Sequence, residues 1–185
     1  DLTMILCLPE VITVAEHRQL RAWIDGSAFT DGGLTVGQAL ADIKNNRELT
    51  AFDPVMAKVT ALVRDAFARH EVFLSAARPR TMAAVMVNRY GPGMFYGAHV
   101  DAPIIGHPNL LRSDLSFTLF LAGPDDYDGG ELVFEQAGQT QAFKLPARAA
   151  IVYPTGQLHR VDTVTRGERL AVVGAVDGDR TLLPL

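Results

Sequence analysis

Residues 82–101 read MAAVMVNRYGPGMFYGAHVD, and this stretch carries the pattern that decides the fold. The apolar run Met82–Tyr90 leads into the turn signal Gly91-Pro92-Gly93, and a second extended run then leads to His99 and Asp101. Similar short runs, separated by turns rich in Gly, Pro and Asp, are Leu115–Leu121, Glu131–Phe134, Ala142–Leu145, Ala149–Tyr153 and Leu170–Val176. Short strands with frequent turns predict an antiparallel β-sandwich or β-barrel.

The N-terminal part of the chain has helical patterns instead. Thr13 and Glu16 have the spacing of a capping box, and Gly26 is a plausible helix stop. Asp53 and Pro54 form an N-cap and first-turn pair. The apolar residues that follow at helical spacing are Val55, Met56, Val59, Leu62, Val63, Ala66 and Phe67. We therefore predict two helices, each with one apolar face that packs on the β-structure.

The whole chain, residues 1–185, is predicted to form one mainly β domain. A helical segment over about residues 4–75 buttresses a β-core over about residues 80–177. The polar, glycine-rich segment Asp31–Asn46 is expected to be an ordered loop or a short extended segment.

The composition excludes several classes of function. With 17 Lys and Arg against 21 Asp and Glu, the net charge of −4 gives no general attraction to nucleic acid or anionic lipid. The longest apolar runs are too short to cross a bilayer. Cys7 is the only cysteine, which excludes a disulfide framework or a thiolate zinc site within one chain. No signal peptide is evident, and we expect a cytoplasmic protein.

Three residues have the pattern of a metal site. On a strand, His99 and Asp101 project from the same face because the side-chain period is two. A second histidine, His159, follows a turn further along the chain. Two histidines and one carboxylate occupy three positions of an octahedron and leave three open, as non-haem Fe(II) oxygenases require. A His-x-Asp triplet alone is a weak signal, because solvated loop histidines are common.

Arg169 is the fourth candidate, and it starts an otherwise apolar strand ten residues after His159. An arginine that points inward there is costly unless it meets an anion. Its guanidinium fork could bind a carboxylate through two parallel hydrogen bonds. The alternative is a surface salt bridge or an arginine that points outward at the strand end.

Taken together, these residues resemble a known family. The chain resembles the bacterial PKHD-type hydroxylases of the Fe(II)/2-oxoglutarate-dependent dioxygenase superfamily, which are relatives of prolyl 4-hydroxylases. The likeness runs from Met4 to about Arg169, and its stretches are Lys44-Asn45-Asn46, Asn88-Arg89-Tyr90, residues 96–101, 114–121 and 126–132, Tyr153-Pro154 and residues 158–161. The tail Ala175–Leu185 departs from it, being shorter than the partly helical ending associated with the family.

The resemblance implies a double-stranded β-helix core, also called jelly-roll or cupin-like, with the metal site at its open mouth. It implies that His99, Asp101 and His159 bind Fe(II) and that Arg169 pairs with the distal carboxylate of 2-oxoglutarate. Tyr90 is expected beside this co-substrate, or else as a buried barrel aromatic. Thr118 adds a hydroxyl to the same pocket, or else only lines the core. O2 is the second co-substrate, and ascorbate is implied as a reductant.

The implied reaction is hydroxylation of a peptidyl or free amino acid, or of another small metabolite, with release of succinate and CO2. Two alternatives remain at this point. One is a non-catalytic barrel that binds iron or 2-oxoglutarate as a sensor, and the other is a zinc hydrolase, since the same three ligands also describe a catalytic zinc site. The residues do not indicate the oligomeric state.

The remaining motifs have less specific interpretations. Lys44-Asn45-Asn46 either lines the substrate entrance or forms a solvated or capping cluster. The stretch 128–131 reads first as a structural turn whose glycines permit positive φ. His17, His70 and His107 are expected at the surface.

Overall fold

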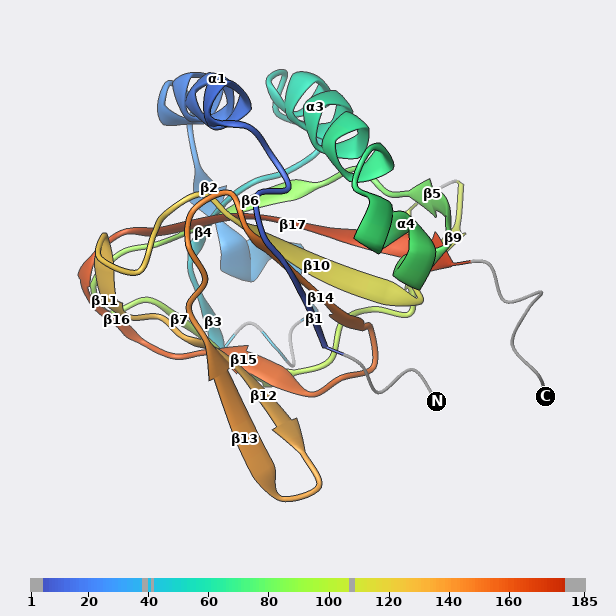
Figure 1. Cartoon of the computed structure of the whole chain (residues 1–185). Coiled ribbons are helices and arrows are strands. Elements are labelled where there is room, and N and C mark those ends of the chain that lie inside the picture. Colours follow the sequence, from blue (N-terminus) through green and yellow to red (C-terminus); the bar gives the residue numbers. More distant parts are fainter. Residues whose placement is uncertain (1–4, 38–39, 41, 107–108, 179–185) are drawn as a thin grey trace.

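Two antiparallel β-sheets face each other, and helices cover the outer side of the larger sheet (Figure 1). The computed structural model describes residues 5–37, 40, 42–106 and 109–178. This arrangement confirms the mainly β jelly-roll core with a helical N-terminal buttress. In the part of the chain so described, no helix is long and apolar enough to cross a membrane.

The larger sheet has the strand order β1-β14-β10-β17-β6-β4-β2, and β5 also pairs with β17. Its strands are β1 (Leu6–Leu8), β2 (Thr30–Asp31), β4 (Arg47–Leu49), β5 (Pro79–Met82), β6 (Met86–Tyr90), β10 (Leu115–Phe120), β14 (Ala150–Pro154) and β17 (Arg169–Gly178). Sequence-distant neighbours such as β10 and β17 are typical of the crossing connections of a jelly roll.

The smaller sheet has the order β13-β12-β15-β7-β3. Its strands are β3 (Lys44–Asn45), β7 (Phe95–His99), β12 (Leu132–Gln136), β13 (Gln139–Phe143) and β15 (His159–Val161). Two further pairs join β8 (Ile104–Ile105) to β9 (Leu111–Arg112) and β11 (Tyr127–Gly129) to β16 (Val164–Gly167).

Helix α1 (Val14–Asp25) begins and ends as predicted. Thr13 and Glu16 form the capping box, and Gly26 is the C-cap residue. A short 3-10 helix, η1 (Gly32–Thr35), and strands β2 and β3 occupy the predicted loop between the helices.

Helix α3 (Met56–Ala68) begins later than predicted. Asp53 is not its N-cap, because the Asp53 carboxylate accepts from the Val55 backbone N–H in the turn before the helix. Helix α4 (Glu71–Ala77), which lies at the end of the predicted helical segment, is capped by the ring of His70.

The alternation of β10 separates the core from a cavity. Phe117 packs on Phe67 of α3, with ring centroids 4.5 Å apart, on the helical side of the sheet. Ser116 and Thr118 project to the opposite side because side chains alternate along a strand. The polar residues of β10 therefore face the space between the two sheets.

Two strand predictions need correction. The run Met82–Tyr90 is divided between β5, which ends at Met82, and β6, which begins at Met86, because the pairing with β17 is interrupted between them and the Val85 N–H bonds to the hydroxyl of Thr60. Of the predicted run Ala142–Leu145, only Ala142 and Phe143 lie in a strand, β13, which begins at Gln139 because it continues the hairpin with β12. The first three residues of β13, Gln139, Thr140 and Gln141, are polar and exposed, so they lack the apolar pattern from which strands were predicted.

Candidate metal centre

A cavity of about 480 Å³ lies between the two sheets. Strands β6, β10, β14 and β17 of the larger sheet and β3, β7 and β15 of the smaller sheet all contribute to its wall. All six site residues predicted from the sequence line it: Tyr90, His99, Asp101, Thr118, His159 and Arg169.

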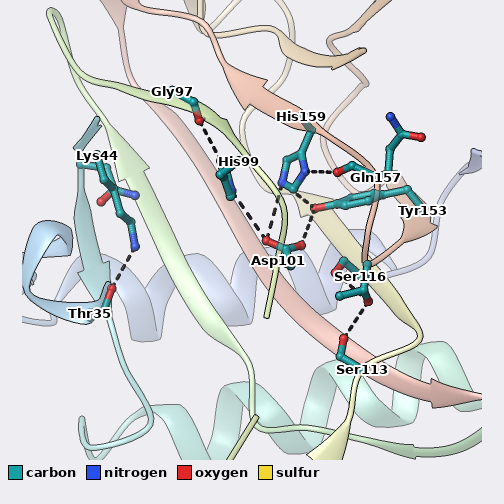
Figure 2. Close-up of polar contacts among 12 residues, drawn as sticks. Thr35, Lys44, Gly97, His99, Asp101, Ser113, Ser116, Tyr153, Gln157 and His159 are labelled. Atoms are coloured by element: carbon teal, nitrogen blue, oxygen red, sulfur yellow. Dashed lines mark hydrogen bonds and ion pairs between the residues drawn. The ribbon is translucent and has the colours of Figure 1, made fainter. Parts of the chain in front are cut away.

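His99, Asp101 and His159 meet in this cavity (Figure 2). His99 ends β7, and His159 begins the neighbouring strand β15 directly opposite it. Asp101 lies just beyond β7 rather than on it, but it points the same way. One ligand atom from each residue lies within 4.8 Å of the other two. The Oδ1 atom of Asp101 is 3.6 Å from Nε2 of His99 and 3.7 Å from Nε2 of His159.

Backbone carbonyls determine which ring nitrogen of each histidine is free. The Nδ1–H of His99 donates to the carbonyl of Gly97, and the Nδ1–H of His159 donates to that of Gln157, both at 2.8 Å. A carbonyl only accepts, so in the neutral rings the lone pair is on Nε2. Both lone pairs therefore face Asp101, and such outer hydrogen bonds are typical of metal-binding histidines.

The electrostatics favour the ligand form of this group. Burial raises the pKa of Asp101, but its interactions with the imidazoles of His99 and His159 outweigh this, so the pKa lies below its usual value. Burial lowers the pKa of His159, and proximity to His99 adds to this, against the opposing effect of Asp101. A carboxylate and a neutral imidazole are the forms that bind metal.

Arg169 lies at the start of β17, only 1% exposed and opposite Tyr90 in the neighbouring strand. Its guanidinium carbon is 5.2 Å from the ring centroid of Tyr90 and 5.5 Å from that of Phe120. No carboxylate among the described residues forms an ion pair with it, and its buried Nε has no hydrogen-bond partner there. The alternative of a surface salt bridge is therefore wrong. A buried, unpaired guanidinium fits an anionic ligand.

Tyr90 and Thr118 are buried in the wall of the same cavity. Burial raises the pKa of Tyr90 to about 12, although the positive charge of Arg169 opposes this. Both side chains therefore lie in the wall of the cavity that Arg169 also lines.

Comparisons with known proteins decide the family. The sequence model of a protein family described as "2OG-Fe(II) oxygenase superfamily" matches residues 85–176. A PKHD-type hydroxylase from Synechococcus sp. (strain JA-2-3B'a(2-13)) is 43% identical over 174 residues, which cover 94% of this chain and 78% of the relative. The chain belongs to the PKHD-type hydroxylases. It is therefore a 2-oxoglutarate-dependent dioxygenase, of a class that uses Fe(II), 2-oxoglutarate and O2.

Solved structures support the fold of this hydroxylase. A 2OG-Fe(II) oxygenase family oxidoreductase from Burkholderia pseudomallei has a TM-score of 0.72 at 21% identity, over 94% of this chain and 84% of the other. A prolyl-4-hydroxylase from Pseudomonas putida has a TM-score of 0.61 at 21% identity, over 95% and 92% of the two chains.

Sequence reasoning missed a buried ion pair in the same cavity wall. Lys44 and Glu48 lie 2.6 Å apart with side chains only 3% and 0% exposed. The hydroxyl of Thr35 donates to Glu48 and accepts from Lys44. Lys44 is thus not part of a solvated cluster, although Asn45 is exposed. The missed signal was Glu48 itself, an acidic residue four positions after Lys44 in a β-rich stretch.

Glu48→Ala is expected to destabilise the hydroxylase by about 3–5 kcal/mol, because it leaves the ammonium of Lys44 buried without its partner. Chemical denaturation of the purified chain measures this change. The matched control is Asp128→Ala, which breaks the exposed ion pair with Arg166 and should change stability little. Equal effects of the two substitutions would contradict a structural role of the buried pair.

His17, His70 and the two glycines of the stretch 128–131 have structural roles. His17 and His70 are half-buried rather than at the surface: Nε2 of His17 hydrogen-bonds to the carbonyl of Leu121 at 2.8 Å, and His70 caps α4. His107 and residues 179–185 of the tail lie outside the described residues. Gly129 and Gly130 have φ of 70° and 68°, as expected for these glycines, but the stretch is not a turn: Asp128 and Gly129 lie in β11, where the pairing with β16 shifts register.

Proposed function

We propose that His99, Asp101 and His159 hold Fe(II) and that Arg169 binds the distal carboxylate of 2-oxoglutarate. The observation that carries this proposal is the convergence of three metal-binding side chains and one unpaired, buried guanidinium on a single cavity. The donor set of two imidazoles and one carboxylate is the one that non-haem Fe(II) oxygenases use. Tyr90 and Thr118 are proposed to contact the same co-substrate.

The ferrous ion, when bound, supplies the oxidative chemistry by which 2-oxoglutarate, O2 and a substrate C–H yield succinate, CO2 and an alcohol. The protein contributes the geometry. The carbonyls of Gly97 and Gln157 hold the two imidazoles with Nε2 facing Asp101. Arg169 orients the co-substrate from within the wall, and the enclosing sheets limit access of water.

The proposed substrate is a peptidyl or free amino acid or another small metabolite. A cavity of about 480 Å³ has room for 2-oxoglutarate together with a small side chain or molecule, but not for a folded domain. We further propose that residues 1–185 act as one domain in the cytoplasm, with ascorbate as a reductant that restores ferrous iron.

Succinate formation from 2-oxoglutarate tests the proposal. The purified chain, loaded anaerobically with Fe(II) and then exposed to O2, should form succinate with or without a substrate. Hydrolytic activity with Zn²⁺ and no succinate would favour a zinc hydrolase. Tight binding of 2-oxoglutarate without any turnover would favour a sensor. Either result would contradict the proposed function.

A further inference from the structure

Tyr153 is a buried residue of β14 whose hydroxyl reaches two of the three metal-binding side chains, Asp101 and His159 (Figure 2). The hydroxyl oxygen is 3.5 Å from Oδ2 of Asp101 and 3.4 Å from Nε2 of His159. The ring packs edge-on against Phe134, with centroids 4.8 Å apart. The ring is therefore held in place by packing, and the hydroxyl is aimed at the candidate metal centre.

A phenylalanine would satisfy this packing equally well. A buried hydroxyl costs free energy unless it finds a hydrogen-bond partner, so its presence on a 3% exposed residue needs an explanation. The Tyr153 hydroxyl has Asp101 and His159 within hydrogen-bond reach, and Thr118 donates a further hydrogen bond to its oxygen. The proton of the hydroxyl is therefore free to be donated to the metal-binding side chains.

The two oxygens of Asp101 face different partners. Oδ1 lies 3.6 and 3.7 Å from the two Nε2 atoms, in the direction where a shared ion would bind. Oδ2 is the atom within reach of Tyr153. His159 already uses Nδ1–H for the carbonyl of Gln157, and its Nε2 is needed for the metal. The single hydroxyl proton of Tyr153 is then left for Oδ2 of Asp101.

We propose that Tyr153 is a positioning residue that donates a hydrogen bond to Oδ2 of Asp101 and so keeps this carboxylate monodentate. A carboxylate that binds through both oxygens would occupy a second coordination position. Tyr153 thereby preserves the open positions that a bidentate co-substrate and O2 together require. This inference rests on the proposed function of His99, Asp101 and His159.

The test is the affinity of the metal-free chain for Co²⁺, measured by anaerobic calorimetry without 2-oxoglutarate or substrate. Tyr153→Phe keeps the ring and its contacts and removes only the hydroxyl. We expect Co²⁺ to bind about 10–100-fold more weakly, because the carboxylate of Asp101 is no longer held in its orientation toward the ion. The matched control is Tyr127→Phe, since the buried hydroxyl of Tyr127 in β11 forms no hydrogen bond with His99, Asp101 or His159. This control should bind Co²⁺ within about two-fold of the wild type.

A double-mutant cycle separates positioning from a general structural effect. If Tyr153 acts through Asp101, Tyr153→Phe has no further effect on Co²⁺ affinity in an Asp101→Ala background. The same loss in both backgrounds would overturn the inference, because the hydroxyl would then act through His159 or through packing. Thermal unfolding of each variant checks that the fold is kept. The Co²⁺ absorption spectrum of Tyr153→Phe is a second measurement, and it should show a changed coordination of the ion.

The outcomes for this inference and for the proposed function are distinct. Wild-type protein that binds one Co²⁺ ion, together with unchanged affinity and spectrum in Tyr153→Phe, would overturn only the role of Tyr153. Wild-type protein that binds no Co²⁺ at His99, Asp101 and His159 would overturn both.

Discussion

His99→Ala is expected to weaken metal binding severely and to abolish succinate formation. The substitution removes one of three ligands, and alanine offers no donor atom to replace Nε2. Loss of a direct ligand should weaken Co²⁺ or Fe²⁺ binding by more than about 100-fold, since loss of an outer hydrogen bond alone costs 10–100-fold. Succinate should fall to the level of the metal-free protein. Calorimetry and a succinate assay on the same preparation measure both effects.

The matched control for this variant is His17→Ala. His17 is a half-buried histidine of α1 whose ring bonds to a backbone carbonyl outside the cavity. This variant should keep the metal affinity and the turnover of the wild type. Near-normal succinate formation by His99→Ala would mean that the metal is bound elsewhere, and the proposed ligand set would be wrong.

Arg169→Ala is expected to raise the KM for 2-oxoglutarate strongly while metal affinity changes little. A buried, charge-assisted bidentate pair loses on the order of 2–5 kcal/mol when one partner is removed. This corresponds to a KM increase of roughly 30-fold to several thousand-fold. Arg169 has no carboxylate partner among the described residues, so its removal leaves no protein charge unpaired.

The conservative variant Arg169→Lys separates charge from geometry. Lysine keeps the positive charge but loses the planar fork, so its KM should lie between those of the wild type and Arg169→Ala. Steady-state kinetics at varied 2-oxoglutarate, with Co²⁺ affinity measured in parallel, distinguish these outcomes. An unchanged KM in Arg169→Ala would mean that another side chain holds the co-substrate.

The sequence predicted the residues of the candidate metal centre better than it predicted the contacts that hold them in place. The side chains of His99 and Asp101 point the same way because the two residues are two positions apart, and this spacing can be read directly from the sequence. The approach of His159 depends on the pairing of β15 with β7, and only the resemblance to a family made it specific. The inward direction of Arg169 stayed open until the structure placed it opposite Tyr90 and away from carboxylates.

Features that depend on long-range packing were not predictable from patterns. Lys44 lies in a polar stretch, and its burial depends on how Glu48 and Thr35 fold around it. Tyr153 reads as an ordinary strand tyrosine, because its role depends on the position of Asp101 52 residues earlier in the chain. In both cases the surroundings of the side chain depend on an ion pair or a hydrogen bond between different strands or loops. The spacing of apolar residues along the chain does not indicate such contacts.

Anomalous diffraction from a crystal soaked with Mn²⁺ or Fe²⁺ tests the central claim most directly. We expect one metal peak at about 2.0–2.2 Å from Nε2 of His99, Nε2 of His159 and Oδ1 of Asp101. Added 2-oxoglutarate should bind the same ion and point its distal carboxylate at Arg169. A peak bound by other residues, in a protein that still forms succinate, would contradict the account.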